Sequence, residues 1–266
     1  MEQIKIYHYY SFGYNYRILL DGNSNLTNKQ CYDHIKSYND FIRRLDLGVT
    51  TSSIGLVGLI EDMTKLQKLV KAKRTRDNKV EEAFWKQIIE KLKKVDTTLD
   101  AELNTKIAYL LNAKRYSNEI LLKKIYHLFS TDTYAALPEI AQFDFEEAGK
   151  CLAFDRYTAC GFHSLRGTED VLKMFYEKVI GVTAIDSATW GTFETAITEA
   201  IARGTLIPPP EEQLIINIRS LRKYYRNKTQ HPQNTYSSDE AQDLLSLCIK
   251  TVNELVADLR SRGLLS

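Results

Sequence analysis

The chain has 266 residues, of which 44% are hydrophobic, so a sizeable core is expected and disorder is not. Only five prolines and twelve glycines occur, which disfavours a turn-rich sandwich or barrel and favours an all-α helical bundle. Because the formal net charge is only +2, binding of an anion requires local clustering of basic residues.

Residues 1–140 are expected to form an N-terminal helical region whose role the sequence does not indicate. The first 20 residues are rich in aromatic side chains, which favours a short strand or an ordered arm. Thr27 and Gln30 match a capping box and begin a helix over 27–47, which Gly48 ends. The spacing of apolar residues predicts further helices over 51–74, 78–95, 99–112 and 117–129.

The loop around Pro138 marks the expected boundary with a second domain over residues 141–266. In this half the apolar residues recur at helical spacing, and Gly181 supplies a helix stop. The pattern predicts helices over 145–156, 157–180 and 190–203.

A further helix is expected over about 211–230. Its end is set by Pro232, because a proline disfavours the helical conformation of the preceding residue, His231. A second capping box, Ser237 with Glu240, begins the final helix. The final helix would then complete a helical bundle.

The predicted helix over 211–230 carries basic residues along one arc. At 100° per residue its apolar side chains face a core, and the basic side chains gather beside them. No acidic residue occurs from Gln213 to Ser238, and like charges three or four residues apart destabilise a helix. We therefore interpret the arc as requiring an external anion, the phosphates of RNA. The candidate substrate-binding residues are Arg219, Arg222, Lys223 and Lys228.

Arg226 and His231 are the candidate catalytic pair. They lie five residues apart at the end of this helix, so both side chains can point into one pocket. A histidine can take a proton from one oxygen and give it to another, and a guanidinium can hold a phosphate through two hydrogen bonds. An imidazole and a guanidinium are the groups needed to cleave RNA without a metal, in a reaction in which the 2′-hydroxyl attacks the phosphate. The expected product ends are a 2′,3′-cyclic phosphate and a 5′-hydroxyl.

The segment LRKYYRNKTQHP resembles the signature of the HEPN (higher eukaryotes and prokaryotes nucleotide-binding) superfamily, in which Arg-x4-6-His ends one long helix and a capped final helix follows. The polar residue after the arginine, Asn227, also matches. Upstream, FDFEEAGKCLAFDRYTACGFHSLRGTEDVLKMF is similar to the first helices of HEPN-type domains in bacterial defence proteins, with Arg166 and Glu169 at a recurrent Arg-x-x-Glu. The resemblance covers roughly 141–262, and residues 1–140 resemble no family.

The resemblance implies a four-helix core and a homodimer that brings two Arg-x4-His sets into one cleft. It further implies a metal-independent endoribonuclease acting on RNA as a toxin or antiviral (abortive infection) effector. Arg226 and His231 would be catalytic and Asn227 auxiliary. Some members are restrained by a nucleotidyltransferase antitoxin that modifies a tyrosine two positions after the histidine. That position is Gln233 here, although Tyr236 is nearby, so the restraining partner is left open as an antitoxin or another regulatory protein.

Simpler interpretations stay open beside these. Arg226 and His231 also suit a helix C-terminus, where cations stabilise the last carbonyl groups. His163, Arg166 and Glu169 lie on a helix expected to pack near the site, where Glu169 could orient the catalytic pair, but a core histidine and a structural salt bridge fit as well. The alternative function is a non-catalytic HEPN-like module that binds a nucleotide, RNA or a partner protein.

A second basic run lies at residues 65–79, relieved only by Asp77. It could extend an RNA track, although such runs are usually solvated helix faces. The sequence contains no metal-ligand or phosphate-loop motif and no apolar run of membrane-spanning length. The four cysteines are far apart and form no CxxC pair. We therefore expect a cytoplasmic protein with reduced thiols and without a metal, another cofactor or a membrane partner.

Overall fold

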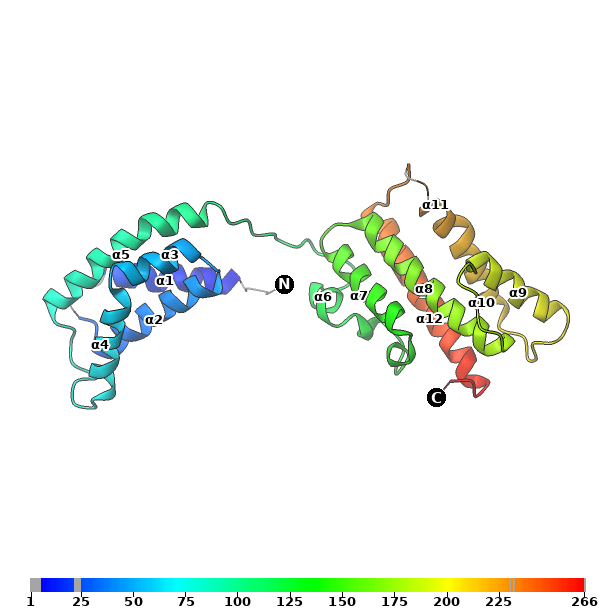
Figure 1. Cartoon of the computed structure of the whole chain (residues 1–266), viewed down its shortest axis with the longest axis horizontal. Helices are drawn as coiled ribbons and strands as arrows, with labels where there is room; N and C mark the ends of the chain where they lie inside the picture. The colour runs from blue at the N-terminus through cyan, green and yellow to red at the C-terminus, as the bar shows by residue number, and fades with distance from the viewer. Residues whose placement is uncertain (1–5, 22–24, 230, 232, 266) are drawn as a thin grey trace. The chain divides into compact units, whose positions relative to one another are not determined.

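The computed structural model describes residues 6–21, 25–229, 231 and 233–265 (Figure 1). The described residues form helices joined by turns and loops, with one isolated β-bridge between Thr27 and Lys79. The expected all-α fold is thus confirmed. Among these residues, no helix combines the length and the apolar character that crossing a lipid bilayer requires.

The chain divides into two compact units, residues 1–109 and 110–266, and each unit has its own apolar core. The predicted boundary at 140/141 is therefore wrong. The segment 110–140 contributes Leu121 and Ile125 to the core of the second unit, so it folds with that unit. Pro138 does not separate domains; it immediately precedes a helix of the second unit.

The first unit contains five described helices. They are α1 (Ile6–Asp21), α2 (Asn28–Arg44), α3 (Gly48–Leu56), α4 (Leu59–Lys71) and α5 (Glu82–Leu103). The strand or arm expected at the N-terminus is a helix, because Phe12 and Tyr16, four residues apart, both stack on Tyr38 of α2. The capping box of Thr27 and Gln30 is confirmed at the start of α2.

Two helices predicted for this unit differ in their bounds from the helices that the structure contains. The single helix expected over 51–74 is broken into α3 and α4 at Gly58, whose φ of 71° lies in the left-handed region. The helix α5 ends at Leu103, and residues 104–117 contain no helix, so the prediction over 99–112 is wrong beyond Leu103.

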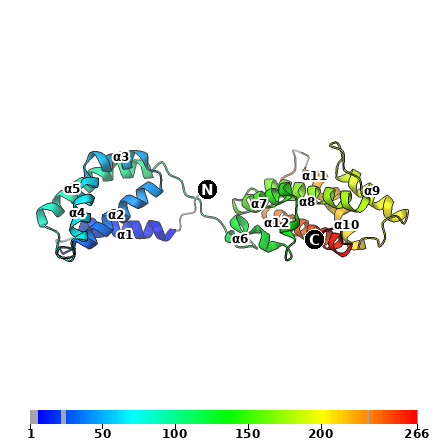
Figure 2. The same cartoon turned by 60° about the horizontal axis from the view of Figure 1, so that its bottom comes forward.

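The second unit is built around α8, which packs along α7 and along α12 (Figures 1 and 2). Gly181 ends α8 in the left-handed conformation, and Ser237 with Glu240 caps α12, as predicted. Its helices are α6 (Asn118–Lys123), η1 (Ile125–Leu128), η2 (Tyr134–Ala136), α7 (Glu139–Ala153), α8 (Tyr157–Ile180), α9 (Trp190–Ala202), α10 (Glu212–Ser220), η3 (Leu221–Arg226), α11 (Asn227–Thr229) and α12 (Ser238–Ser261).

Candidate functional site

The predicted Arg-x4-His segment follows a π-helical turn. The helix α10 passes at Ser220 into η3, where the Asn227 N–H donates to the Arg222 carbonyl, five residues back. The wider turn changes the direction of each later side chain from that of an α-helix. Single π turns inside α-helices are frequent at functional sites. The basic arc of the sequence prediction is thus interrupted between Leu221 and Arg226.

Arg226 is held by one long contact. Its Nη2 lies 3.5 Å from Glu169 Oε1, and the same oxygen accepts the backbone N–H of Trp190 at 2.8 Å. Arg226 Nε is buried and has no hydrogen-bond partner among the described residues. A guanidinium carries five N–H donors, so Arg226 keeps donors that this carboxylate does not use. Glu169 therefore contacts Arg226 as the sequence suggested.

Arg219 and Arg222 have a different partner, Glu194 of α9. Arg222 Nε lies 2.7 Å and Arg219 Nε 3.2 Å from the two carboxylate oxygens of Glu194, whose side chain is 8% exposed. The inference that the whole arc requires an external anion is therefore wrong for these two arginines, because the fold supplies their counterion. The charges along one segment do not reveal a carboxylate that reaches them from another helix.

His231 lies on the surface just past α11. Its backbone N–H donates to the Lys228 carbonyl at 3.1 Å, and its ring makes no hydrogen bond or ion pair with a described residue. Asn227 is exposed, and Lys223 and Lys228 are exposed cations whose ammonium groups lie 5.1 and 6.0 Å from the rings of neighbouring tyrosines. The imidazole and the two ammonium groups are therefore open to solvent.

Tyr236 fixes the chain between His231 and α12. Its hydroxyl lies 2.7 Å from Thr229 Oγ1, and its backbone N–H donates to Thr158 Oγ1 of α8 at 3.1 Å. Gly161 makes room for the ring, since a Cβ there would lie 2.9 Å from it. Burial raises the pKa of the Tyr236 phenol. These contacts join Thr229 to Tyr236, and Tyr236 to α8.

His163 and Arg166 belong to another cluster, centred on Asp144 of α7. The Asp144 carboxylate is fully buried, and its Oδ1 lies 2.8 Å from His163 Nδ1. Arg166 donates to both carboxylate oxygens, with Nε 2.6 Å from Oδ2. The structure thus joins these two residues to each other and not to Arg226, which agrees with the open interpretation of a core histidine and a structural salt bridge.

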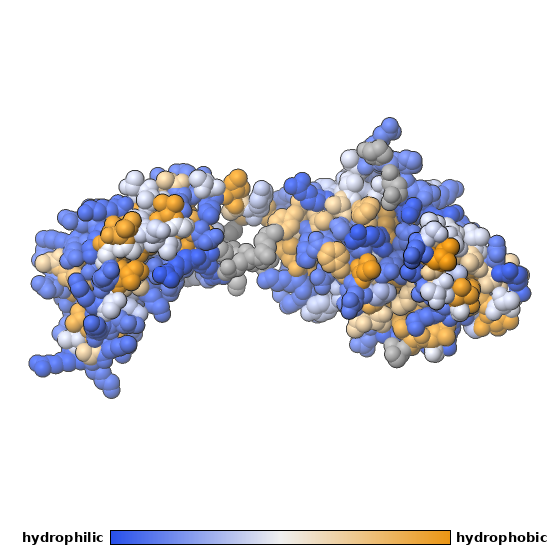
Figure 3. Space-filling view, in the orientation of Figure 1, coloured by the Kyte–Doolittle hydropathy of each residue, from blue (hydrophilic) through white to orange (hydrophobic). Residues whose placement is uncertain are grey.

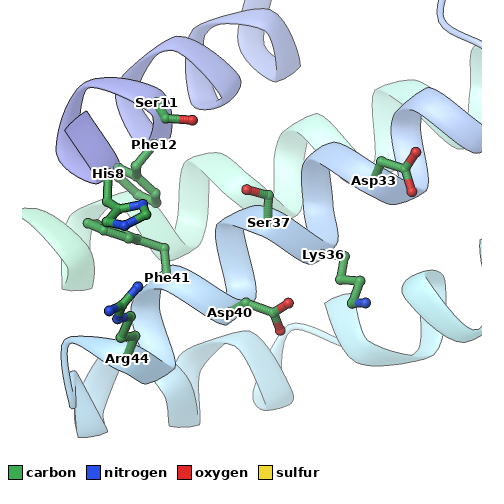
Figure 4. Close-up of a pocket in the computed structure, with 9 residues that line it drawn as sticks. All are labelled: His8, Ser11, Phe12, Asp33, Lys36, Ser37, Asp40, Phe41 and Arg44. Atoms are coloured by element: carbon green, nitrogen blue, oxygen red, sulfur yellow. The ribbon is translucent and has the colours of Figure 1, made fainter. Parts of the chain in front are cut away.

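A separate pocket of about 350 Å³ lies between α1 and α2 of the first unit (Figure 4). The rings of Phe12 and Phe41, 4.6 Å apart, form its apolar part. Its polar lining has both signs of charge, including Lys36 and Asp40. The mixed charge gives no preference for an anion or a cation. Among the residues that the structure describes, no three His, Cys, Asp or Glu side chains are grouped to hold a metal ion.

Comparison with family models, with curated proteins and with solved structures gives no match for this chain. The HEPN resemblance therefore rests on the residues of the sequence itself. Two acidic partners were not predicted from the sequence, Glu194 and Asp144. A signal was present for Glu194, which falls on the apolar side of the predicted helix over 190–203, where an unpaired charge is too costly to remain. Asp144 lies just before the predicted helix over 145–156 and gave no such signal.

Proposed function

We propose that this chain is a metal-independent endoribonuclease of the HEPN type, with Arg226 and His231 as its catalytic residues. One contrast carries the proposal. Arg222 Nε and Arg219 Nε lie 2.7 and 3.2 Å from the Glu194 carboxylate, whereas Arg226 has a single carboxylate contact, at 3.5 Å, among the described residues. A guanidinium with donors that Glu169 does not use, five residues before a solvent-accessible imidazole in the sequence, suits the binding of a phosphate.

Each group has a defined part in the reaction. His231 takes the proton of the 2′-hydroxyl, whose oxygen attacks the adjacent phosphorus as the bond to the 5′-oxygen breaks. Arg226 stabilises the negative charge on the non-bridging oxygens, and the 5′-oxygen leaves after taking a proton from the imidazolium or from water. Glu169 orients Arg226 without using all its donors. Asn227 is exposed and is proposed as an auxiliary catalytic residue, and the exposed Lys223 and Lys228 are proposed to contact the RNA backbone.

The same proposal includes the assembly and the biological role that the resemblance implies. The chain would act in the cytoplasm as a homodimer and as a toxin or antiviral effector, restrained by an antitoxin or another regulatory protein. Sedimentation equilibrium checks the assembly. We expect a mass twice the 30.6 kDa of one chain.

The proposal is tested with purified full-length protein, total cellular RNA and EDTA. We expect the wild-type chain to cleave RNA, and both Arg226→Ala and His231→Ala to lose cleavage while far-ultraviolet circular dichroism stays unchanged. His127→Ala is the matched control, since His127 is also an exposed histidine of the second unit and should be dispensable. Full activity of both site variants would contradict the proposal, and tight RNA binding without cleavage by the wild type would favour a non-catalytic binding module.

A further inference from the structure

The last turn of α4 and the loop that joins α4 to α5 present an unpaired basic surface in the first unit. Lys68, Lys71, Lys73, Arg74 and Arg76 are exposed, and none has an ion pair with a described residue. The unit as a whole is basic, with 18 Lys and Arg against 14 Asp and Glu in residues 1–109. Unlike the arginines that Glu194 neutralises, these cations have no counterion in the part of the chain that the structure describes.

The loop has a fixed backbone, so the cations are displayed on an ordered frame. Thr75 Oγ1 donates to the Leu69 carbonyl at 2.7 Å, and Asn28 Nδ2 at the start of α2 donates to the Thr75 carbonyl at 2.8 Å. The backbone N–H groups of Asn28 and Lys29 donate to the carbonyls of Asn78 and Arg76. A surface ordered before binding loses less entropy when it meets its ligand.

An open groove of about 580 Å³ lies beside this loop, between the end of α4 and the start of α5. Lys65, Lys68, Leu69 and Phe84 are among its lining residues, and Lys65 Nζ lies 5.8 Å from the centre of the Phe84 ring. Aromatic rings between cations are the common means of holding single-stranded nucleic acid, because bases stack on the ring and phosphates meet the ammonium groups. Phe84 is half-buried, so only part of its ring faces the groove, beside the two ammonium groups and the one carboxylate of Glu81. The groove therefore combines a partly open ring with cations, the two contacts that such a strand uses.

We propose that the α4–α5 loop and its groove bind single-stranded RNA. The choice of RNA as the polyanion rests on the proposed function, whereas the unpaired basic surface does not. A membrane-binding surface would combine the cations with exposed apolar side chains that enter the bilayer. No large hydrophobic residue between 57 and 106 is exposed among the described residues, and the loop's end of the unit is hydrophilic in the space-filling view (Figure 3).

Binding is measured on the full-length His231→Ala chain, so that cleavage does not interfere, with a fluorescent single-stranded RNA of about 20 nucleotides. Removing two cations with Lys73→Gln/Arg74→Gln should weaken binding about tenfold at low salt and make the slope of log K against log salt shallower by about 1.4. The matched control is Lys93→Gln/Lys94→Gln, which removes two exposed charges on α5, about 15 Å along the helix from Phe84. This control should leave the affinity unchanged. Phe84→Ala should also weaken binding, with the salt slope unchanged.

Equal RNA affinity of the loop variant and the control variant would overturn the proposal. It would also be overturned if the loop variant lost binding to phosphatidylserine vesicles and not to RNA. The outcome is separable from that of the proposed nuclease. If the chain binds RNA through the loop but never cleaves it, only the nuclease proposal is refuted. If the chain cleaves RNA and the loop variant binds RNA as tightly as the control, only the RNA-binding proposal for the loop is refuted.

Discussion

Two acid–arginine pairs of the second unit, Asp144 with Arg166 and Glu169 with Arg226, lie in opposite circumstances. Around the buried Asp144, His163 and Arg166 both reach the carboxylate at hydrogen-bond distance. Glu169 has one 3.5 Å contact with Arg226, and His231, five residues later in the sequence, is exposed with no side-chain partner among the described residues. The Asp144 carboxylate is satisfied within the fold, whereas Arg226 keeps donors that Glu169 does not use and the His231 imidazole is accessible to solvent.

The difference teaches that residue type alone does not distinguish a structural cluster from a reactive one. Buried polar groups that satisfy one another stabilise a fold, whereas groups with unused hydrogen-bonding capacity at the surface can bind a ligand. The comparison therefore predicts that substitutions in the Asp144 cluster change stability and that substitutions around Arg226 change cleavage.

The largest expected effect is on stability, from Asp144→Ala. The substitution leaves Arg166 and His163 without their shared carboxylate. Because Arg166 is 46% exposed and regains water, the cost stays below that of an unpaired buried charge, at about 3 kcal/mol. We expect the free energy of unfolding, measured by urea denaturation, to fall by this amount. A loss below about 1 kcal/mol would show that the cluster is not structural.

The next largest effect is on cleavage, and it distinguishes Arg226 from Arg222, both in η3. Arg226→Lys keeps the charge but removes the planar donor pair that fits a phosphate, so we expect cleavage to fall about 100-fold. Arg222→Lys retains a cation beside Glu194 and should change cleavage less than about threefold. Initial rates on a defined RNA check both variants, and an equal loss in the two would remove the distinction drawn between these arginines.

The two glutamates that hold these arginines give a smaller contrast. Glu194→Gln removes a nearly buried counterion shared by two arginines and should lower the unfolding free energy by about 1–2 kcal/mol. Glu169→Gln should cost less stability, because Glu169 is more exposed and its contact with Arg226 is long, but should slow cleavage. Thermal unfolding and cleavage rates of the same preparations test the pair. The reverse pattern would contradict the assigned roles.

The smallest effect concerns Asp170 of α8. Burial raises the pKa of its carboxyl, and Oδ2 has no hydrogen-bond partner among the described residues. With the folded pKa above the unfolded value, the stabilising contribution of the protonated form is lost as the pH rises through the folded pKa. We therefore expect Asp170→Asn to raise Tm at pH 7, and the gain to vanish below about pH 3.9. An equal gain at both pH values would point to a cause other than ionisation.

Helix positions were predictable from sequence where local rules decide them. The capping boxes of Thr27 and Ser237 and the stop at Gly181 depend on neighbours in the chain, and they were predicted correctly. The N-terminal aromatic segment was not, because its helix is selected by stacking on Tyr38 of α2.

The candidate site divides in the same way. The sequence predicted that Arg226 and His231 lie at one helix end, because they are neighbours in the chain. It did not predict the π turn or the partners of the arginines. Glu194 reaches Arg219 and Arg222 from α9, and Glu169 reaches Arg226 from α8. Such contacts depend on how helices pack, which charge counting along one segment does not reveal.

The central claim, that Arg226 and His231 cleave RNA by activating its 2′-hydroxyl, is tested most directly by the chemistry of the product ends. Wild-type protein is incubated with a defined RNA in EDTA, and the ends are mapped by their reactivity with phosphatase and kinase. The account predicts 2′,3′-cyclic phosphate and 5′-hydroxyl ends that disappear in His231→Ala. Ends bearing a 3′-hydroxyl and a 5′-phosphate, or cyclic ends that persist in His231→Ala, would contradict it.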